Sequence, residues 1–94
     1  MSELRFTWDK NKAQQNKRAH GVTFEEATTV FLDLDYLLTR DAVEPERFVA
    51  IGMSSLARVL FVVHCERGQR LRIVSARRAT RREHEAYDRR RESD

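Results

Sequence analysis

The middle of the chain holds four short runs rich in β-branched and aromatic residues, and these runs constrain the fold more than any other feature of the sequence. They span residues 36–39, 47–54, 58–64 and 69–75, and polar or glycine-containing turns separate them. Residues of these types are enriched in strands, and turn residues between such runs mark reversals of the chain. The pattern therefore predicts an antiparallel meander.

A strand and a helix are expected before the meander. Residues 4–8 alternate between apolar and polar types, which indicates a short strand with one buried face. Asp9 is a suitable N-cap for a helix that runs to Ala19, and Gly21 is typical of a C-terminal stop.

Thr23 opens a second predicted helix. Together with Glu26 it matches the capping box, in which the threonine hydroxyl accepts one backbone N–H and the glutamate side chain accepts another. Apolar residues recur at helical spacing from Phe24 to Phe31, and the helix should end near residues 33–35. We expect the two helices to form a hairpin beside the first strand.

The last predicted strand presents two different faces. Leu71 and Ile73 point one way, whereas Arg70 and Arg72 point the other way, because side chains alternate along a strand. One face of the sheet should therefore carry guanidinium groups.

A C-terminal helix should follow this strand. Thr80 and Glu83 form another capping box, and the helix runs to about Arg91. Its inner face is only thinly apolar, so the helix is either mobile in isolation or packed against another protein.

The basic residues are unevenly distributed. The chain has 94 residues, which fits one domain spanning residues 1–94, and a net charge of +3. Residues 1–57 carry a charge of −2, whereas residues 58–94 carry 11 cations against 6 anions. All 11 cations are arginines, whose planar guanidinium groups pair with phosphate and stack on bases. The C-terminal half is therefore expected to contact nucleic acid.

Other site classes find little support. Cys65 is the only cysteine, which rules out an internal disulfide and suits a reducing compartment. The N-terminus has no apolar leader segment, and no run approaches the roughly 20 apolar residues that cross a bilayer, so a cytoplasmic location is expected. His20, His64 and His84 are far apart in sequence and match no metal-ligand spacing, so neither a metal nor a cofactor is predicted.

Three separated motifs resemble the BrnT family of toxins in order and spacing. Together they cover nearly the whole chain, which is more specific than any one motif alone. The matching residues are Phe6-Thr-Trp-Asp, Lys12, Asn16, His20-Gly-Val, Phe24-Glu-Glu-Ala and Phe31, then Glu46-Arg47, Ile51-Gly52 and Ser54, then Arg72-Ile-Val-Ser-Ala-Arg-Arg-Ala-Thr80, Glu83 and Tyr87. The chain departs from the family pattern at Ala19 and Arg78, where lysine is usual, and at Ala57, where glycine is common.

The resemblance implies a RelE-like α+β fold. In that fold, the N-terminal strand and helical hairpin pack on an antiparallel sheet of about four to five strands, and a C-terminal helix follows. It also implies an endoribonuclease that cleaves mRNA, inhibits translation and is neutralised by a cognate antitoxin with a ribbon-helix-helix part. The pair would repress its own operon, so that the toxin meets DNA only through the antitoxin.

RNA can be cleaved without a metal, because its own 2′-hydroxyl attacks the adjacent phosphorus. The enzyme must supply a base, positive charge for the phosphate and an acid. We expect Arg77, Arg78 and Arg81 to act on the phosphate and His20 to transfer a proton. The residues expected to bind the remaining RNA are Lys12, Lys17, Arg72, Arg82 and Tyr87.

Each of these assignments has a structural alternative. The arginines can form a solvated basic face paired with Glu83 and Glu85. His20 can serve a helix end, and Tyr87 can pack against the sheet. For the whole protein, the alternatives are a non-catalytic module that binds nucleic acid or an acidic protein, and a purely structural interaction domain.

Overall fold

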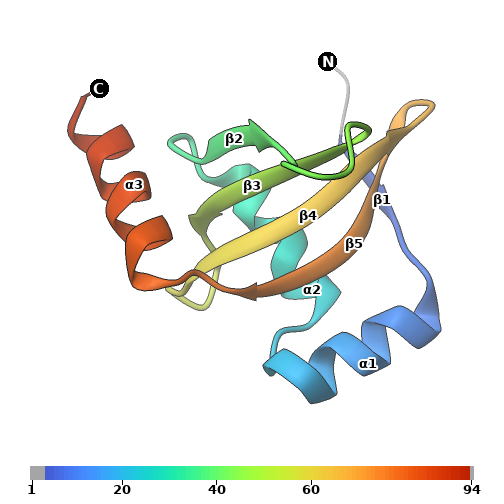
Figure 1. The fold of residues 1–94 in the computed structure, drawn as a ribbon. Helices are drawn as coiled ribbons and strands as arrows, with labels where there is room; N and C mark the ends of the chain where they lie inside the picture. The colour runs from blue at the N-terminus through green and yellow to red at the C-terminus, as the bar shows by residue number, and fades with distance from the viewer. Residues whose placement is uncertain (1–3, 94) are drawn as a thin grey trace.

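The computed structural model describes residues 4–93, so residues 1–3 and 94 of the predicted domain lie outside the described residues. The elements run in the order β1, α1, α2, η1, β2, β3, β4, β5 and α3 (Figure 1). Their bounds are Arg5–Thr7 for β1, Lys10–His20 for α1, Phe24–Thr28 for α2, Thr29–Leu32 for the 3-10 helix η1, Leu37–Arg40 for β2, Arg47–Met53 for β3, Val59–Arg67 for β4, Arg70–Arg78 for β5 and Arg81–Glu92 for α3. No helix among the described residues has the length and hydrophobicity needed to span a membrane.

The sheet has five strands in the order β1-β5-β4-β3-β2. Strands β2 to β5 pair in antiparallel fashion, which confirms the predicted meander. The N-terminal strand extends the sheet at its other edge and pairs with β5 in parallel, with Phe6 opposite Leu71. The sheet is therefore mixed, and the α+β class is confirmed.

The helix caps mostly follow the sequence. Asp9 accepts the backbone N–H groups of Asn11 and Lys12, and Gly21 ends α1 in the left-handed conformation. Thr80 and Glu83 form the complete capping box of α3. The prediction for Glu26 is wrong, because its carboxylate accepts hydrogen bonds from Ser54 and Arg58.

Helices cover both faces of the sheet, and each face has its own core. Helices α1 and α2 lie on one side, and α3 stands apart from them (Figure 1). The first core joins Phe24 of α2 and residues of η1 to buried residues of the sheet, such as Leu60 and Ile73. The second core lies on the opposite face, where Tyr87 of α3 packs with Val49, Ile51 and Val59.

Asn16 attaches α1 to the edge of β5. Its side-chain amide donates to the Ala76 carbonyl at 2.7 Å and accepts the Ala76 N–H at 3.0 Å. The same amide donates to the Val22 carbonyl at 3.0 Å. Since β1 pairs only with residues 70–72, the Asn16 amide takes the place of a neighbouring strand further along β5.

Replacement of Asn16 by alanine should destabilise the protein strongly. The change leaves both backbone groups of Ala76 and the Val22 carbonyl without their partner in a buried place, at about 1–3 kcal/mol for each unsatisfied group. We expect Asn16→Ala to lower the free energy of unfolding by at least about 3 kcal/mol in urea titrations. Asn11→Ala, on the exposed side of the same helix, should change it by less than about 0.5 kcal/mol. A loss below about 1 kcal/mol for Asn16→Ala would contradict this account.

Ala57 lies in the turn between β3 and β4 with φ of 60°, the only positive φ at a non-glycine residue among the described residues. A side chain in this region costs roughly 1–2 kcal/mol, which glycine avoids. Because glycine also makes the unfolded chain more flexible, part of this gain is offset. Ala57→Gly should therefore raise the free energy of unfolding by about 0.5–1 kcal/mol, whereas Ala42→Gly, at an exposed loop position with an ordinary backbone, should lower it slightly. Equal effects of the two changes would refute the explanation.

His64 is buried on the face of the sheet that carries the first core, near two aromatic rings. Its ring lies 4.9 Å from that of Phe31 and 6.2 Å from that of Phe48. Burial lowers the pKa of His64 below its usual value of 6.5, which the contacts with the Val62 carbonyl and Glu66 only partly offset.

This burial predicts a loss of stability at mildly acidic pH. Above pH 6.5 the histidine is neutral in both states, and as the pH falls the unfolded chain takes up the proton first. The free energy of unfolding should therefore fall from pH 6.5 down to the pKa of the folded state, by at most about 1.4 kcal/mol per pH unit. His64→Phe should lose this part of the pH dependence in urea titrations at pH 7 and 5, and His20→Gln should keep it. An unchanged slope in His64→Phe would disprove the assignment.

Candidate active site

A β-bulge in β5 decides which arginines share a face of the sheet. Val63 pairs with Ser75 and His64 pairs with Ile73, so Val74 has no direct partner on β4. The extra residue reverses the alternation of side chains along the rest of β5. Accordingly, Ile73 and Ala76 are three residues apart, and both are buried in the first core.

The bulge places Arg72 and Arg77 on the same face. Arg72 lies opposite Cys65 and Arg77 opposite Phe61, and directly opposed residues project from the same face of a sheet. Cys65 and Phe61 are four residues apart on β4, so they share a face as well. Without the bulge, five residues of strict alternation would point one of the two arginines into the α1–α2 core.

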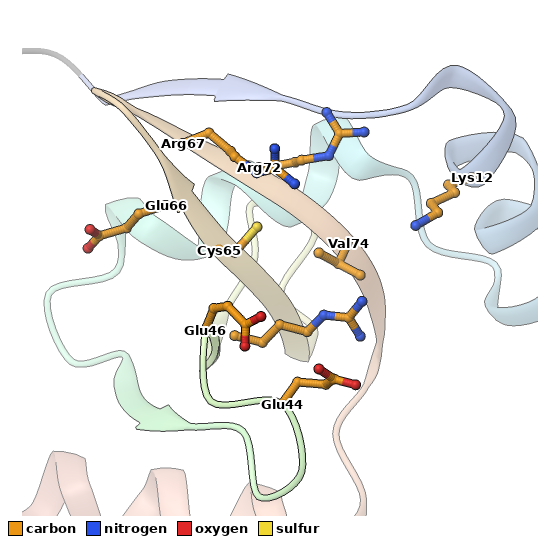
Figure 2. Close-up of a pocket in the computed structure, with 9 residues that line it drawn as sticks. Lys12, Glu44, Glu46, Cys65, Glu66, Arg67, Arg72 and Val74 are labelled. Carbon is orange, nitrogen blue, oxygen red and sulfur yellow. The ribbon is translucent and has the colours of Figure 1, made fainter.

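A row of cross-strand neighbours lies at one end of this face. Arg47 on β3 pairs with Cys65 on β4, and Cys65 pairs with Arg72 on β5. Two guanidinium groups therefore stand on either side of the single cysteine. Lys12 reaches the same place from α1 (Figure 2).

These residues line two adjoining hollows, which together we call the basic groove. The first has a volume of about 290 Å³ and the second about 350 Å³, near the lower end of the roughly 300–1,000 Å³ typical of ligand sites. Lys12, Arg47 and Val74 line both of them. The first is also lined by Glu44, Glu46, Cys65, Glu66, Arg67 and Arg72, and the second by Gln15, Asn16, Ala19 and His20.

Three of the residues that helix α1 contributes to the lining of the groove are spaced four apart along the helix. Lys12, Asn16 and His20 lie on one side of the helix, since residues four apart are neighbours on a helix surface. Asn16 is fixed to Ala76 of β5 by two hydrogen bonds. The lysine and the histidine are therefore held on either side of a rigid attachment point.

The cations of the groove are not neutralised by direct ion pairs. Among residues 4–93, no carboxylate lies within ion-pair distance of Lys12, Arg47 or Arg72. The charges of Arg72 and Lys12 do act on the carboxylate of Asp9, whose pKa lies below its ordinary value. The main cause is donation by the backbone N–H groups of Lys12 and Asn11, and the charges of Arg72 and Lys12 contribute less.

Arg77 is engaged within the protein. Its guanidinium donates to both carboxylate oxygens of Glu83, at 2.8 and 3.0 Å, and lies over the Phe61 ring at 3.9 Å. Glu83 also accepts the backbone N–H of Thr80, and the Arg77 hydrogen bond is the largest cause that lowers the pKa of Glu83. Arg77 therefore joins the end of β5 to the start of α3.

The expectation that Arg77, Arg78 and Arg81 act together on one phosphate is wrong, because the three side chains point to different surfaces. Arg78 lies opposite Leu60, so it projects from the face of the first core, away from Arg77. Arg81 pairs with Glu85 at 3.3 Å on the outside of α3, and its side chain is 92% exposed. Arg82 is exposed as well. Only Arg72 of this group lines the basic groove.

Of the remaining predicted residues, some are exposed on α1 and the others are engaged within the protein. His20 and Lys17 are exposed on α1, and His20 lines the second hollow. Tyr87 is 2% exposed and its hydroxyl donates to Asp33, so its ring is not accessible to a base in this structure. Burial and the Asp33 carboxylate raise the pKa of Tyr87 to about 12. His84 pairs with Asp88 on α3.

Arg47 and the nearby carboxylates were missed as site residues by the sequence analysis. Their position depends on the register of β3 against β4 and on the path of the β2–β3 loop, both of which are tertiary features. The available signal was the pair Glu46-Arg47 at the start of a predicted strand. Within residues 4–93, no three His, Cys, Asp or Glu side chains gather in a group that could hold a metal ion.

Comparisons with known proteins agree on one family. A family model described as ribonuclease toxin, BrnT, of type II toxin-antitoxin system matches residues 8–83. The crystal structure of the Brucella abortus ribonuclease toxin BrnT is similar with a TM-score of 0.69 and 23% sequence identity, over 84% of this chain and 100% of that chain. At this identity the likeness shows the fold alone. No curated protein sequence matches the chain. Because the family model covers most of its length, the chain belongs to the BrnT family of ribonuclease toxins of type II toxin-antitoxin systems.

Proposed function

We propose that this toxin is an endoribonuclease that cleaves mRNA in the basic groove without a metal ion, and so inhibits translation. The observation that carries the proposal is the set of three cations, Lys12, Arg47 and Arg72, that converge on the groove without a carboxylate partner within the described residues. The family supplies the general activity of a ribonuclease toxin.

A phosphate group is the ligand that suits these cations best. Arginine binds phosphate through two parallel hydrogen bonds, and bonds to charged groups contribute about 1.5–3 kcal/mol each. A phosphate at Arg72 or Arg47 displaces no existing ion pair. At Arg77 it would have to compete with the two hydrogen bonds from Glu83. The groove is therefore the better place for the scissile phosphate.

The chemistry that follows uses the nucleophile of RNA itself. The 2′-oxygen attacks the adjacent phosphorus, the bond to the 5′-oxygen breaks, and the products carry a 2′,3′-cyclic phosphate and a 5′-hydroxyl. Cations at the groove stabilise the charge on the phosphate in the transition state, which is the task that a metal performs in other nucleases. His20 stands at the groove to move a proton.

The arginines outside the groove are assigned to the flanking RNA. Arg77 follows Arg72 by five residues on the same face of β5, and because of the bulge these residues span only four residues of β4, about 13 Å along the strand. It is placed to contact a second phosphate through the exposed third of its side chain. Arg78, Arg81, Arg82 and Lys17 offer weaker, salt-sensitive contacts on the surface around it.

The partner of the toxin is proposed to be an antitoxin of the ribbon-helix-helix type. It neutralises the ribonuclease by binding it, and the complex represses the shared operon through the DNA-binding part of the antitoxin. Membership of a type II toxin-antitoxin family supports a protein antitoxin. Both proteins would act in the cytoplasm, where mRNA is translated.

The test measures cleavage of a mixed-sequence single-stranded RNA by the purified, antitoxin-free toxin in excess EDTA. Cleavage should persist in the chelator, and Arg72→Ala should reduce its rate by about 10²–10³-fold, because it removes a donor to the transition state. The matched control is Arg89→Ala, an exposed arginine on α3, which should change the rate less than about threefold. Arg77→Ala should instead lower the free energy of unfolding, because it removes the ion pair with Glu83 that joins β5 to α3.

Three results would count against the proposal. Salt-sensitive RNA binding without any cleavage would indicate a non-catalytic binding module. Activity that EDTA abolishes and Mg²⁺ restores would refute metal independence. Full activity in Arg72→Ala, with activity lost in a folded Arg77→Ala variant, would move the active site to the far end of β5.

A further inference from the structure

We infer that Glu46 is the general base that removes the proton from the 2′-hydroxyl of the RNA. This inference rests on the proposed ribonuclease activity in the basic groove. It assigns the base to Glu46 and the acid to His20. Its basis is that the two hollows share Lys12 and Arg47, whereas Glu46 lines only the first and His20 only the second.

The β2–β3 loop holds Glu46 at the groove in a fixed backbone conformation. Four hydrogen bonds cross the base of this loop or close it internally, and Pro45 restricts the backbone directly before Glu46. The bonds run from the Asp41 N–H to the Arg47 carbonyl at 2.9 Å, from the Arg47 N–H to the Glu44 carbonyl at 3.0 Å, from the Glu44 N–H to the Asp41 carboxylate at 3.0 Å, and from the Arg40 guanidinium to the Pro45 carbonyl at 3.2 Å. The loop is therefore preorganised for a catalytic side chain.

The carboxylate of Glu46 is available for chemistry. Within residues 4–93 its side chain has neither an ion pair nor a hydrogen bond, although Lys12, Arg47 and Arg72 line the same hollow. The carboxylate is therefore not in contact with these cations, so both can contact a bound nucleotide. Glu66 also lines the hollow, but its carboxylate points away from the other labelled side chains (Figure 2).

The two hollows place a base and an acid on different sides of the shared cations. Glu46 lines only the first hollow and His20 only the second, whereas Lys12 and Arg47 line both. A phosphate held at the shared cations would thus meet a carboxylate on one side and an imidazole on the other. Displacement at phosphorus proceeds with the attacking and leaving oxygens roughly in line, so it needs proton acceptor and donor on opposite sides.

The step balances without any further reactant. The 2′-hydroxyl proton passes to the Glu46 carboxylate as the 2′-oxygen forms its bond to phosphorus. The bond from phosphorus to the 5′-oxygen breaks, and this oxygen takes a proton from the imidazolium of His20. Arg47 directly follows Glu46 in the chain, so the base and one phosphate ligand are positioned by the same strand end.

The test compares Glu46→Gln with wild type on the mixed-sequence single-stranded RNA. The cleavage rate should fall by about 10²–10⁴-fold, and the rise of the rate with pH on the acidic side of the profile should disappear. Binding of the same RNA with 2′-O-methyl groups, which cannot be cleaved, should stay within about threefold or become tighter. Glu25→Gln, which removes an exposed carboxylate of α2 that lines neither hollow, should keep the rate within about threefold.

A second substrate separates the base from the acid. When sulfur replaces the 5′-oxygen, the leaving group departs without a proton, so a variant that lacks the acid recovers its rate and one that lacks the base stays slow. Glu46→Gln should stay slow on this substrate. Rescue of the variant on this substrate would indicate that Glu46 is the acid. A normal or faster rate on ordinary RNA would show that Glu46 takes no part in the reaction. Either result overturns the inference. Absence of cleavage by the wild type would instead overturn the proposed function itself.

Discussion

The attachment of α1 to the edge of β5 through Asn16 is the constraint on which the rest of this structure depends. The amide satisfies both backbone groups of Ala76 and the carbonyl of Val22, so it joins a helix, the turn after that helix and a strand. Such a bond pattern fixes position and rotation together, because an amide pairs with both strand groups in only one orientation. Lys12 and His20 lie one turn to either side, so the interaction that closes the fold also builds one wall of the groove.

The bulge in β5 is the second feature that positions the groove residues. It keeps Ile73 and Ala76 in the first core while it turns Arg72 and Arg77 to the opposite face. The two arginines then differ only in their neighbours. Glu83 binds Arg77 and makes it part of the joint between β5 and α3, whereas Arg72 stands beside Lys12 with its charge available. Neighbouring carboxylates, more than the number of arginines, separate structural cations from cations that can take a ligand.

The sequence predicted elements well and the site only in part. Periodicity, caps and turn residues located the strands and helices, because these signals act over a few residues. The joint action of Arg77, Arg78 and Arg81 on one phosphate was predicted wrongly, because Arg78 projects from the opposite face of β5 and the other two arginines pair with Glu83 and Glu85. From the sequence, pairing with these two carboxylates was only the alternative prediction. The bulge at Val74 has no glycine or other local marker, and the groove depends on the register between strands far apart in the chain.

The residues of the groove are all held by rigid elements of the fold. Lys12 and His20 lie on a helix pinned by Asn16, Arg47 and Arg72 lie on paired strands, and Glu46 lies on a loop closed by hydrogen bonds. If RNA is cleaved in the groove as proposed, charges held this way need not reorganise when the phosphate gains charge in the transition state, and this lack of reorganisation is the main source of electrostatic catalysis. A toxin of this size cannot enclose its substrate, so fixed charges on an open surface must do what burial does in larger enzymes. The same openness leaves the groove accessible to a protein partner, and under the proposed function an antitoxin that covered Lys12 and Arg72 would block RNA without changing the fold.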